Sequence, residues 1–122
     1  MIRKEWNSVE AVYLYGSALT APKPEGSDID LAVLSKEPVS AQKRWEMAQQ
    51  LASFLKTDVD LADLRRSSTV FQFQVISTGR RIDCSDLKAS EDFETYVYSD
   101  YARLNEERKE ILDEIQKRGR IY

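Results

Sequence analysis

The chain has 122 residues, a formal net charge of −3 and no histidine. This length fits one domain, and a content of 42% hydrophobic and 32% charged residues is typical of a globular protein rather than a disordered or membrane protein. Without histidine, the chain cannot form a Ser-His-Asp triad, a Cys-His pair or a histidine-ligated zinc site. Its single cysteine, Cys84, also excludes an intrachain disulfide and a cysteine-rich zinc site.

The sequence contains neither a basic face nor an apolar segment of membrane-spanning length. Its arginine and lysine residues form only short pairs, whereas sequence-independent binding to nucleic acid needs clustered cations. The first residues lack the apolar stretch of a secretory signal. We therefore expect a cytoplasmic protein that binds no nucleic acid directly and makes no membrane contact.

Two strands are predicted in the first third of the chain. Residues 9–15 are rich in β-forming side chains and end at Gly16, which indicates a mostly buried strand followed by a turn. The prolines and glycine of residues 22–26 exclude regular structure there. Residues 28–34 alternate between polar and apolar side chains, which predicts a second strand with a charged end.

The middle of the chain predicts a helix, a third strand and a more ambiguous segment. Ser40 is a plausible N-cap of an amphipathic helix that continues through Lys56. Residues 57–61 return to a period of two, as expected for a strand. Residues 68–78 are compatible with a strand or with a helix capped at Ser68 or Thr69; we favour the helix, followed by a short edge strand over 80–84.

From Ser90 almost to Gly119, large apolar side chains recur at intervals of four and three residues. This pattern predicts one long helix, or two helices with a bend near Ser99. The apolar stripe is longer than a small sheet can cover, so we expect part of it to contact a helical partner. The expected organisation is a single domain over 1–122, with a core over about 9–85 and a C-terminal helical segment over about 90–118.

The main candidate site combines a turn suited to phosphate with carboxylates suited to metal. Gly16 and Ser17 are followed, after ten residues, by Asp28 and Asp30. A glycine after a strand lets the backbone approach a ligand, and a helix starting at Ser17 would direct N–H groups at phosphate. Oxygen ligands without histidine select hard cations such as Mg²⁺ or Mn²⁺, and two such ions are a known arrangement for phosphoryl-type displacement. If the third strand lies beside the second, Asp60 adds a third carboxylate, which could bind metal and accept a proton from an attacking hydroxyl.

In this combination, the residues resemble the minimal nucleotidyltransferases of the polymerase-β superfamily. More narrowly, residues 44–52, 58–65 and 68–70 resemble the MNT-domain antitoxins that are paired with HEPN-domain toxins. The resemblance implies an α+β nucleotidyltransferase fold, with a small mixed β-sheet, helices mainly on one face and a long C-terminal helix. It also implies a hetero-oligomer with a HEPN ribonuclease toxin, which is neutralised when AMP is transferred from ATP to one of its tyrosine hydroxyls.

The same resemblance assigns roles to the motif residues. It implies that Gly16 and Ser17 hold the triphosphate, that Asp28 and Asp30 bind the metals, and that Asp60 is a third ligand and the general base. Many relatives place an arginine soon after the Gly-Ser pair, and here Lys23 is the candidate for that cation.

Several simpler interpretations and two alternative functions stay open at this stage. Arg65 and Arg66 are expected to pair with Asp63 at the surface, and Asp58 to be a solvated neighbour of the site. The tyrosines of the long helix, Tyr96, Tyr98 and Tyr101, are expected to pack rather than to accept AMP. The alternatives to protein adenylylation are an antitoxin that acts by occlusion alone, and a nucleotidyltransferase that modifies a small-molecule hydroxyl.

Overall fold

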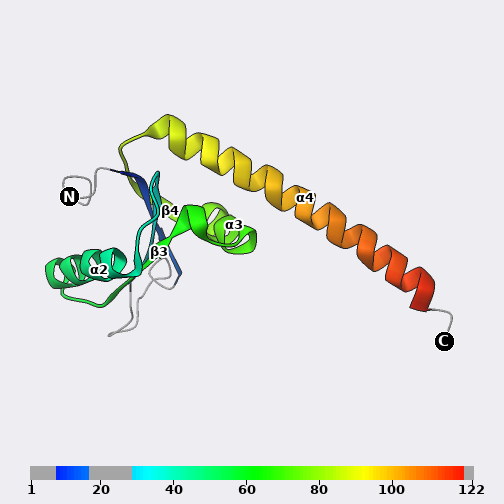
Figure 1. Cartoon of the computed structure of the whole chain (residues 1–122), viewed down its shortest axis with the longest axis horizontal. Helices are drawn as coiled ribbons and strands as arrows, with labels where there is room; N and C mark the ends of the chain where they lie inside the picture. Colours follow the sequence, from blue (N-terminus) through cyan, green and yellow to red (C-terminus); the bar gives the residue numbers. More distant parts are fainter. Residues whose placement is uncertain (1–7, 17–28, 120–122) are drawn as a thin grey trace.

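The computed structural model describes residues 8–16 and 29–119. Within this part of the chain the elements are, in order, β1 (Val9–Tyr15), β2 (Ile29–Ser35), α2 (Ala41–Leu55), β3 (Val59–Asp63), the 3₁₀ turn η2 (Leu64–Arg66), α3 (Thr69–Thr78), β4 (Arg80–Cys84) and α4 (Leu87–Gly119) (Figure 1). The elements anticipated from the sequence are all present, with some shifts in their bounds.

The four strands form one mixed sheet in the order β3-β2-β1-β4. Strand β1 runs antiparallel to both of its neighbours, β2 and β4, whereas β2 and β3 are parallel and are connected through α2. This arrangement confirms the prediction of a small mixed sheet. It also places β4 at one edge, as predicted for residues 80–84.

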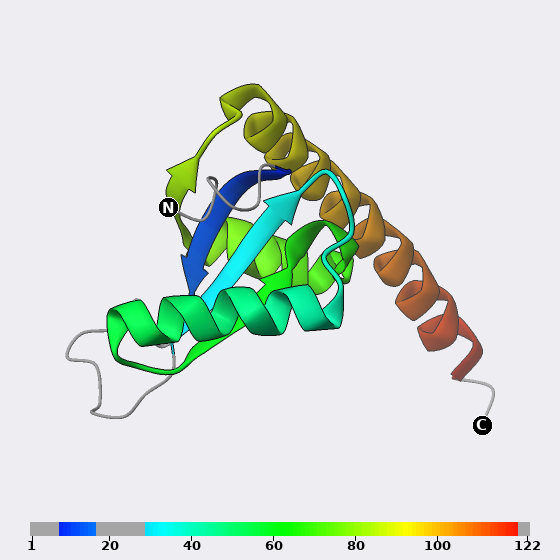
Figure 2. The same ribbon diagram turned by 60° about the vertical axis from the view of Figure 1, so that its left-hand side comes forward.

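Helices cover both faces of the sheet (Figure 2). On one face, α2 contributes Met47 and Leu51 to a core that includes Val33 of β2. On the other face, α3 and α4 contribute Val75 and Phe93 to a second core, which also contains residues of β1 and β2. Of the α-helices in the described part of the chain, α3 and α4 therefore share a face, in agreement with the expectation of helices mainly on one side.

Serine caps define where two of the helices begin. The side chain of Ser40 accepts a hydrogen bond from Lys43 N at the start of α2, and Ser68 accepts one from Phe71 N at the start of α3. Residues 69–78 are thus helical, as we favoured. The two phenylalanines that gave this segment its strand-like alternation pack against different elements: Phe71 contacts β1, and Phe73 contacts α4.

The third strand begins two residues later than predicted. Lys56 adopts a left-handed conformation with φ of 58° as the C-cap of α2, and Thr57 N donates to Ala52 O. The end of the helix therefore includes Thr57, which the sequence pattern assigned to the strand. Strand β3 starts at Val59 and extends to Asp63.

The predicted C-terminal helix is a single element of 33 residues, α4. Its first half is held on the body of the protein by the buried Phe93 and Val97, and Tyr101 stacks on Phe73 of α3 at 3.8 Å between ring centroids. Every side chain over residues 105–117 is exposed, and this half of α4 extends away from the body (Figure 1). No helix among the described residues combines the length and the apolar character that crossing a membrane requires.

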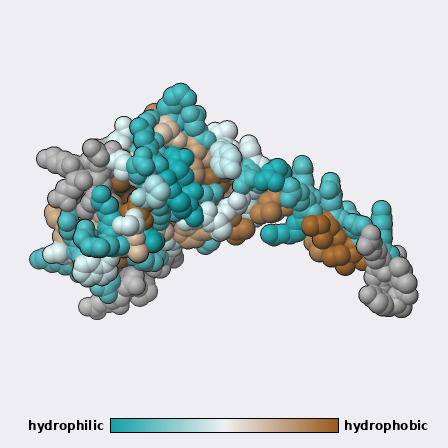
Figure 3. All heavy atoms as spheres, in the orientation of Figure 1, coloured by the Kyte–Doolittle hydropathy of each residue, from teal (hydrophilic) through white to brown (hydrophobic). Residues whose placement is uncertain are grey.

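The exposed half of α4 carries an apolar patch near its end (Figure 3). We call the group Ile111, Leu112 and Ile115 the α4 patch; each of these side chains is 57% exposed. Exposed apolar residues that lie together typically mark a contact surface. This observation agrees with the prediction that the helical stripe exceeds what the sheet can cover.

Candidate active site

Three side chains form a row across the sheet at the end where β1 finishes and β2 and β3 begin. Tyr15 of β1 is paired with Asp30 of β2, and Asp30 is paired with Asp60 of β3. Directly paired residues of neighbouring strands project from the same face of a sheet. Ala32 and Ala62, two residues further along their strands, pack in the core under α3 and α4, which assigns the row to that face. We call these three residues, two carboxylates and one phenol, the carboxylate row.

The row confirms the geometric condition on which the sequence argument depended. Asp60 reaches Asp30 because β3 lies beside β2 in parallel and in register, so that residues 30 positions apart in sequence become direct neighbours. Adjacent strands lie about 4.8 Å apart, which brings the two carboxylates within reach of one ligand. Asp60 is exposed and Asp30 is partly buried, so the pair opens to solvent.

Gly16 turns the chain directly over Asp30. Its φ is +76°, in the left-handed region that favours glycine, and a β-carbon at this position would overlap Asp30 Oδ2 and lie 3.3 Å from Asp30 Cγ. Backbone and carboxylate are thus in close contact, as expected for a turn that holds phosphate beside a metal ligand. The remaining predicted residues of this motif, Ser17 and Asp28, and the candidate cation Lys23 lie outside the described residues.

Tyr15 is a member of the row that sequence reasoning did not select. Burial raises the pKa of its phenol to about 12, and the charges of Asp30 and then Asp60 act in the same direction. The phenol is therefore un-ionised at neutral pH and lies close to both carboxylates. Its position directly before Gly16, at the end of a strand, was the available signal.

The donor set of the row fits a hard divalent cation. Asp30 and Asp60 offer carboxylate oxygens on one face and within reach of one another, and no histidine or thiolate competes for the metal. Among the described residues, no group of three or more acidic, cysteine or histidine side chains meets the criteria for a metal site. A metal site here would hence consist of Asp30 and Asp60 together with Asp28, which lies outside the described residues.

The two arginines left out of the predicted site stabilise the opposite end of the sheet. Arg65 donates to Glu10 Oε1 at 2.6 Å and to Ser35 O at 3.2 Å. Arg66 donates to Ser35 O at 2.7 Å and pairs with Asp63 at 3.5 Å. The predicted pairing with Asp63 is thus confirmed for Arg66, whereas Arg65 pairs with Glu10 instead. Both guanidinium groups are occupied away from the carboxylate row.

The tyrosines of α4 include two packing residues. Tyr101 stacks on Phe73, and Tyr98 makes an edge-on contact with the same ring at 5.6 Å between centroids. These contacts confirm the packing role predicted for Tyr98 and Tyr101. The packing role predicted for Tyr96 is wrong, because its side chain is 60% exposed. Cys84 is partly buried against the core shared by α3 and α4, as expected for a small apolar residue.

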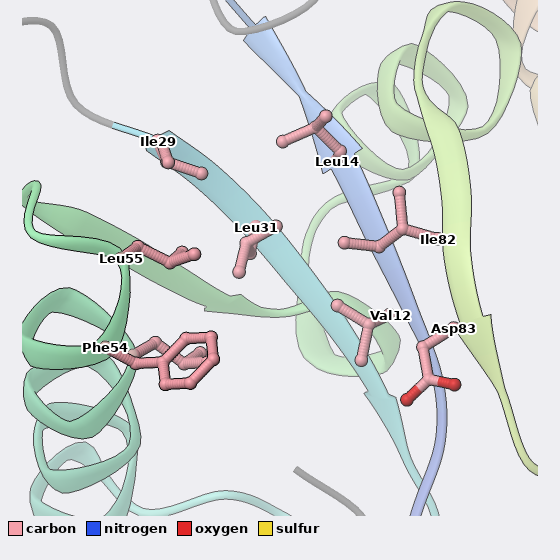
Figure 4. Close-up of a pocket in the computed structure, with 9 residues that line it drawn as sticks. Val12, Leu14, Ile29, Leu31, Phe54, Leu55, Ile82 and Asp83 are labelled. Carbon is pink, nitrogen blue, oxygen red and sulfur yellow. The ribbon is translucent and has the colours of Figure 1, made fainter. Parts of the chain in front are cut away.

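An apolar groove of about 320 Å³ lies on the other face of the sheet, beside α2 (Figure 4). Its lining residues are Val12, Leu14, Ile29, Leu31, Leu51, Phe54, Leu55, Ile82 and Asp83. Asp83 is the single charged side chain of this lining, and it is an anion. Among the described residues, the lining of the groove therefore offers none of the cationic side chains that typically bind phosphate groups.

Comparison with known proteins identifies the family of this chain. The family model described as polymerase beta, nucleotidyltransferase matches residues 1–88. The chain belongs to the polymerase-β nucleotidyltransferase family. Within this family, it is 37% identical over 115 residues to the protein adenylyltransferase MntA of Shewanella oneidensis, a match that covers 94% of this chain and 82% of that protein.

Solved structures give the same assignment for this nucleotidyltransferase. A crystal structure of a toxin-antitoxin with AMP-PNP matches it with a TM-score of 0.79 and 37% identity, covering 94% of this chain and 92% of that chain. A structure of the tri-AMPylated Shewanella oneidensis HEPN toxin in complex with MNT antitoxin matches with a TM-score of 0.71 and 37% identity, covering 93% and 88%. The family and fold predicted from the sequence are therefore confirmed.

Proposed function

We propose that this nucleotidyltransferase is an antitoxin that transfers AMP from ATP to a tyrosine hydroxyl of a cognate HEPN ribonuclease toxin and thereby neutralises it. The observation that carries the proposal is the pairing of Asp30 with Asp60 beside the Gly16 turn. This arrangement belongs to a chain that is 37% identical to a protein adenylyltransferase over nearly its whole length. Because the reaction consumes ATP, we place the protein in the cytoplasm.

The Gly16 turn and Ser17 bind the triphosphate of ATP in this proposal. The turn brings backbone close to Asp30 without an intervening side chain, which leaves space for phosphate oxygens against the sheet. Ser17 adds a hydroxyl donor, and the N–H groups that follow it complete the binding of an anion. ATP then lies with its α-phosphorus beside the carboxylate row.

The transfer step forms one bond to the α-phosphorus and breaks another. The phenolic oxygen of the toxin tyrosine attacks the α-phosphorus, and the bond from that phosphorus to the bridging oxygen of the β-phosphate breaks. Pyrophosphate leaves with the electron pair of that bond, and AMP remains on the tyrosine. Asp60, the exposed carboxylate of the row, accepts the phenolic proton as general base.

Asp28, Asp30 and Asp60 would hold two ions of Mg²⁺ or Mn²⁺ in the working enzyme. A bound divalent cation supplies neutralisation of the negative charge on the phosphate groups. The residues of the chain supply the rest: Gly16 and Ser17 orient the phosphates, and Asp60 receives the proton.

In this proposal the acceptor is presented by a second protein. The sheet and helices α2, α3 and α4 account for nearly all the described residues, and none of these elements forms a separate acceptor-binding domain within that part of the chain. The α4 patch offers an apolar contact surface on a helix that leaves the body of the protein. A helical partner that packs along α4 would bury this patch, and a HEPN toxin is the partner we assign to it.

The test is a mass measurement on the toxin. The purified chain is incubated with its HEPN partner, ATP and Mg²⁺, and we expect the intact mass of the toxin to increase by one or more AMP units. Asp30→Asn, which keeps the shape of the side chain but removes its charge, should abolish this increase. No increase with wild-type protein, under conditions in which both proteins are folded and form a complex, would refute the proposal.

The same pair of proteins distinguishes the alternatives. An antitoxin that acts by occlusion alone would suppress the ribonuclease equally well as wild type and as Asp30→Asn. A nucleotidyltransferase of small molecules would release pyrophosphate from ATP with a hydroxyl compound such as an aminoglycoside, and would leave the toxin unmodified. Inhibition that requires both ATP and Asp30 supports adenylylation of the toxin.

A further inference from the structure

We propose that Tyr15 is a positioning residue of the active site, whose phenolic hydroxyl orients the Asp30–Asp60 pair and whose ring is held in place by Phe71. This inference rests on the proposed function and adds a residue to its machinery. Tyr15 differs from the residues of the Gly-Ser and Asp-x-Asp motifs because it acts on the carboxylates rather than on ATP or the toxin tyrosine.

The position of Tyr15 in the sheet directs its side chain at the carboxylates. It is the direct antiparallel partner of Asp30, and such partners have β-carbons about 4.5–5.5 Å apart on the same face. Asp60 is the next residue of the same row. The charges of Asp30 and Asp60 both act on the phenol, as expected for neighbours on one face of the sheet.

The ring of Tyr15 is held by α3. Phe71 of α3 contacts it edge-on, with 5.3 Å between ring centroids and an angle of 88° between ring planes. At the end of α3, a β-carbon added to Gly79 would lie 3.4 Å from Tyr15 Cβ and 2.8 Å from Leu14 O, so the backbone of this segment packs closely on the end of β1. These contacts of α3 and Gly79 therefore fix the ring of Tyr15 at the end of β1.

A fixed neutral hydroxyl can hold two neighbouring aspartate side chains in place despite the repulsion between their charges. Two like charges on neighbouring strands repel and favour side-chain orientations that separate them. A phenolic O–H that donates to one carboxylate holds its orientation without adding charge. Partners of this kind around ligating carboxylates typically change metal affinity or activity by about 10-fold to 100-fold when they are removed.

The experiment compares Tyr15→Phe, which removes only the hydroxyl, with Phe71→Leu, which removes the aromatic contact that holds the ring. Tyr98→Phe is the matched control, because this tyrosine also contacts a phenylalanine edge-on but lies on α4, where its ring packs on Phe73. For each protein we measure kcat and KM for ATP with the toxin, the melting temperature, and the affinity for Mn²⁺ in the presence of a non-hydrolysable ATP analogue without toxin.

We expect Tyr15→Phe to lower kcat about 10-fold and Mn²⁺ affinity about 10-fold, with the KM for ATP and the melting temperature close to wild type. Phe71→Leu should lower kcat and Mn²⁺ affinity by a smaller factor, and Tyr98→Phe should change neither of these two quantities. Wild-type kcat and Mn²⁺ affinity in Tyr15→Phe would overturn the inference.

The Mn²⁺ measurement separates this inference from the proposed function. It needs no toxin, so a loss of Mn²⁺ affinity in Tyr15→Phe supports the role of Tyr15 even when the wild-type protein leaves the toxin unmodified. Conversely, adenylylation of the toxin by wild type together with unchanged kcat and Mn²⁺ affinity in Tyr15→Phe keeps the proposed function and rejects the role of Tyr15.

Discussion

Gly16 and Asp30 are in such close contact that any side chain at position 16 would displace the Asp30 carboxylate. The end of β1 and the start of β2 thereby place the proposed phosphate-binding turn and the proposed metal-binding carboxylate side by side. Glycine is therefore required at position 16 for two reasons. A side chain would collide with Asp30, and the backbone φ of +76° favours glycine.

We therefore predict that Gly16→Ala lowers activity about 100-fold, since small misplacements of a site can have effects of this size. The left-handed conformation costs alanine about 1 kcal/mol of folding free energy. Lys56→Gly is the matched control, because Lys56 is left-handed, with φ of 58°, but lies at the end of α2. It should retain full activity and wild-type or slightly higher stability. Toxin adenylylation and thermal unfolding measure the two effects, and an active Gly16→Ala would contradict the prediction.

Asp60→Asn should remove activity without lowering stability. Asp30 and Asp60 are direct neighbours on parallel strands, where like charges oppose folding by about 0.2–1 kcal/mol when no cation is bound. Without divalent metal, the melting temperature of Asp60→Asn should equal that of wild type or exceed it by a few degrees. Addition of Mg²⁺ should stabilise wild type more than the variant. A clear decrease in the melting temperature of the metal-free variant would instead indicate a structural role for Asp60.

Charged substitutions in the α4 patch should prevent binding of the toxin while leaving the fold intact. We predict that Ile111→Lys combined with Ile115→Lys weakens the complex by at least 10-fold, because both side chains are 57% exposed and apolar. Glu106→Lys is the control: it changes the net charge by the same amount on the opposite side of α4. Size-exclusion chromatography or calorimetry with the toxin measures the effect. Equal binding by the two variants would place the toxin elsewhere.

The hydroxyl of Tyr13 fastens α4 to the sheet. It lies 2.7 Å from Ser90 Oγ and donates to Glu94 Oε2 at 2.8 Å, and Arg81 donates to the same carboxylate at 3.0 Å. Burial raises the pKa of Tyr13, so the phenol stays neutral. Tyr13→Phe should lower the free energy of unfolding by about 1–2 kcal/mol, whereas Tyr96→Phe, at an exposed position, should have no effect. Denaturant unfolding of both variants tests this difference.

The contact between Thr69 and Asp100 should make the packing of α3 on α4 depend on pH. The hydrogen bond from Thr69, followed by that from Arg103, lowers the pKa of Asp100. A lowered folded-state pKa stabilises the protein above the pKa of the unfolded chain, about 3.9, and this contribution disappears as the pH falls through the folded value. Asp100→Asn should hence be less stable than wild type at pH 7 and nearly equal to it once the pH has fallen below the folded-state pKa of Asp100. A constant difference across this range would refute the assignment.

Much of the fold follows from local sequence patterns. Ser40 and Ser68 cap the helices that their positions predict, and alternation identifies the face that Asp30 shares with Ala32 and Leu34. These features depend on residues a few positions apart, whose geometry is set by helix or strand periodicity. The exception is the start of β3. Thr57 fits the alternating pattern of a strand, but it belongs to the end of α2, and β3 begins at Val59.

The arginines illustrate what local pattern could not provide. Asp63 lies two and three residues from Arg65 and Arg66 and was the evident partner for both, yet Arg65 pairs with Glu10 of β1. Such pairings depend on which strands are neighbours. Tyr15 escaped selection for the same reason, because its relation to Asp60 exists only across three strands.

By itself the sequence determined the chemistry that the site can perform: a Gly-Ser turn, carboxylates at alternate positions and the absence of histidine indicate oxygen-ligated metal and phosphate. The tertiary structure decided which of these groups meet. The parallel register of β2 and β3 makes Asp60 the neighbour of Asp30, β1 adds Tyr15 to the same row, and packing on α3 leaves the far half of α4 exposed. Residue types and short spacings are local properties, whereas strand order and helix docking are set by burial of the whole core.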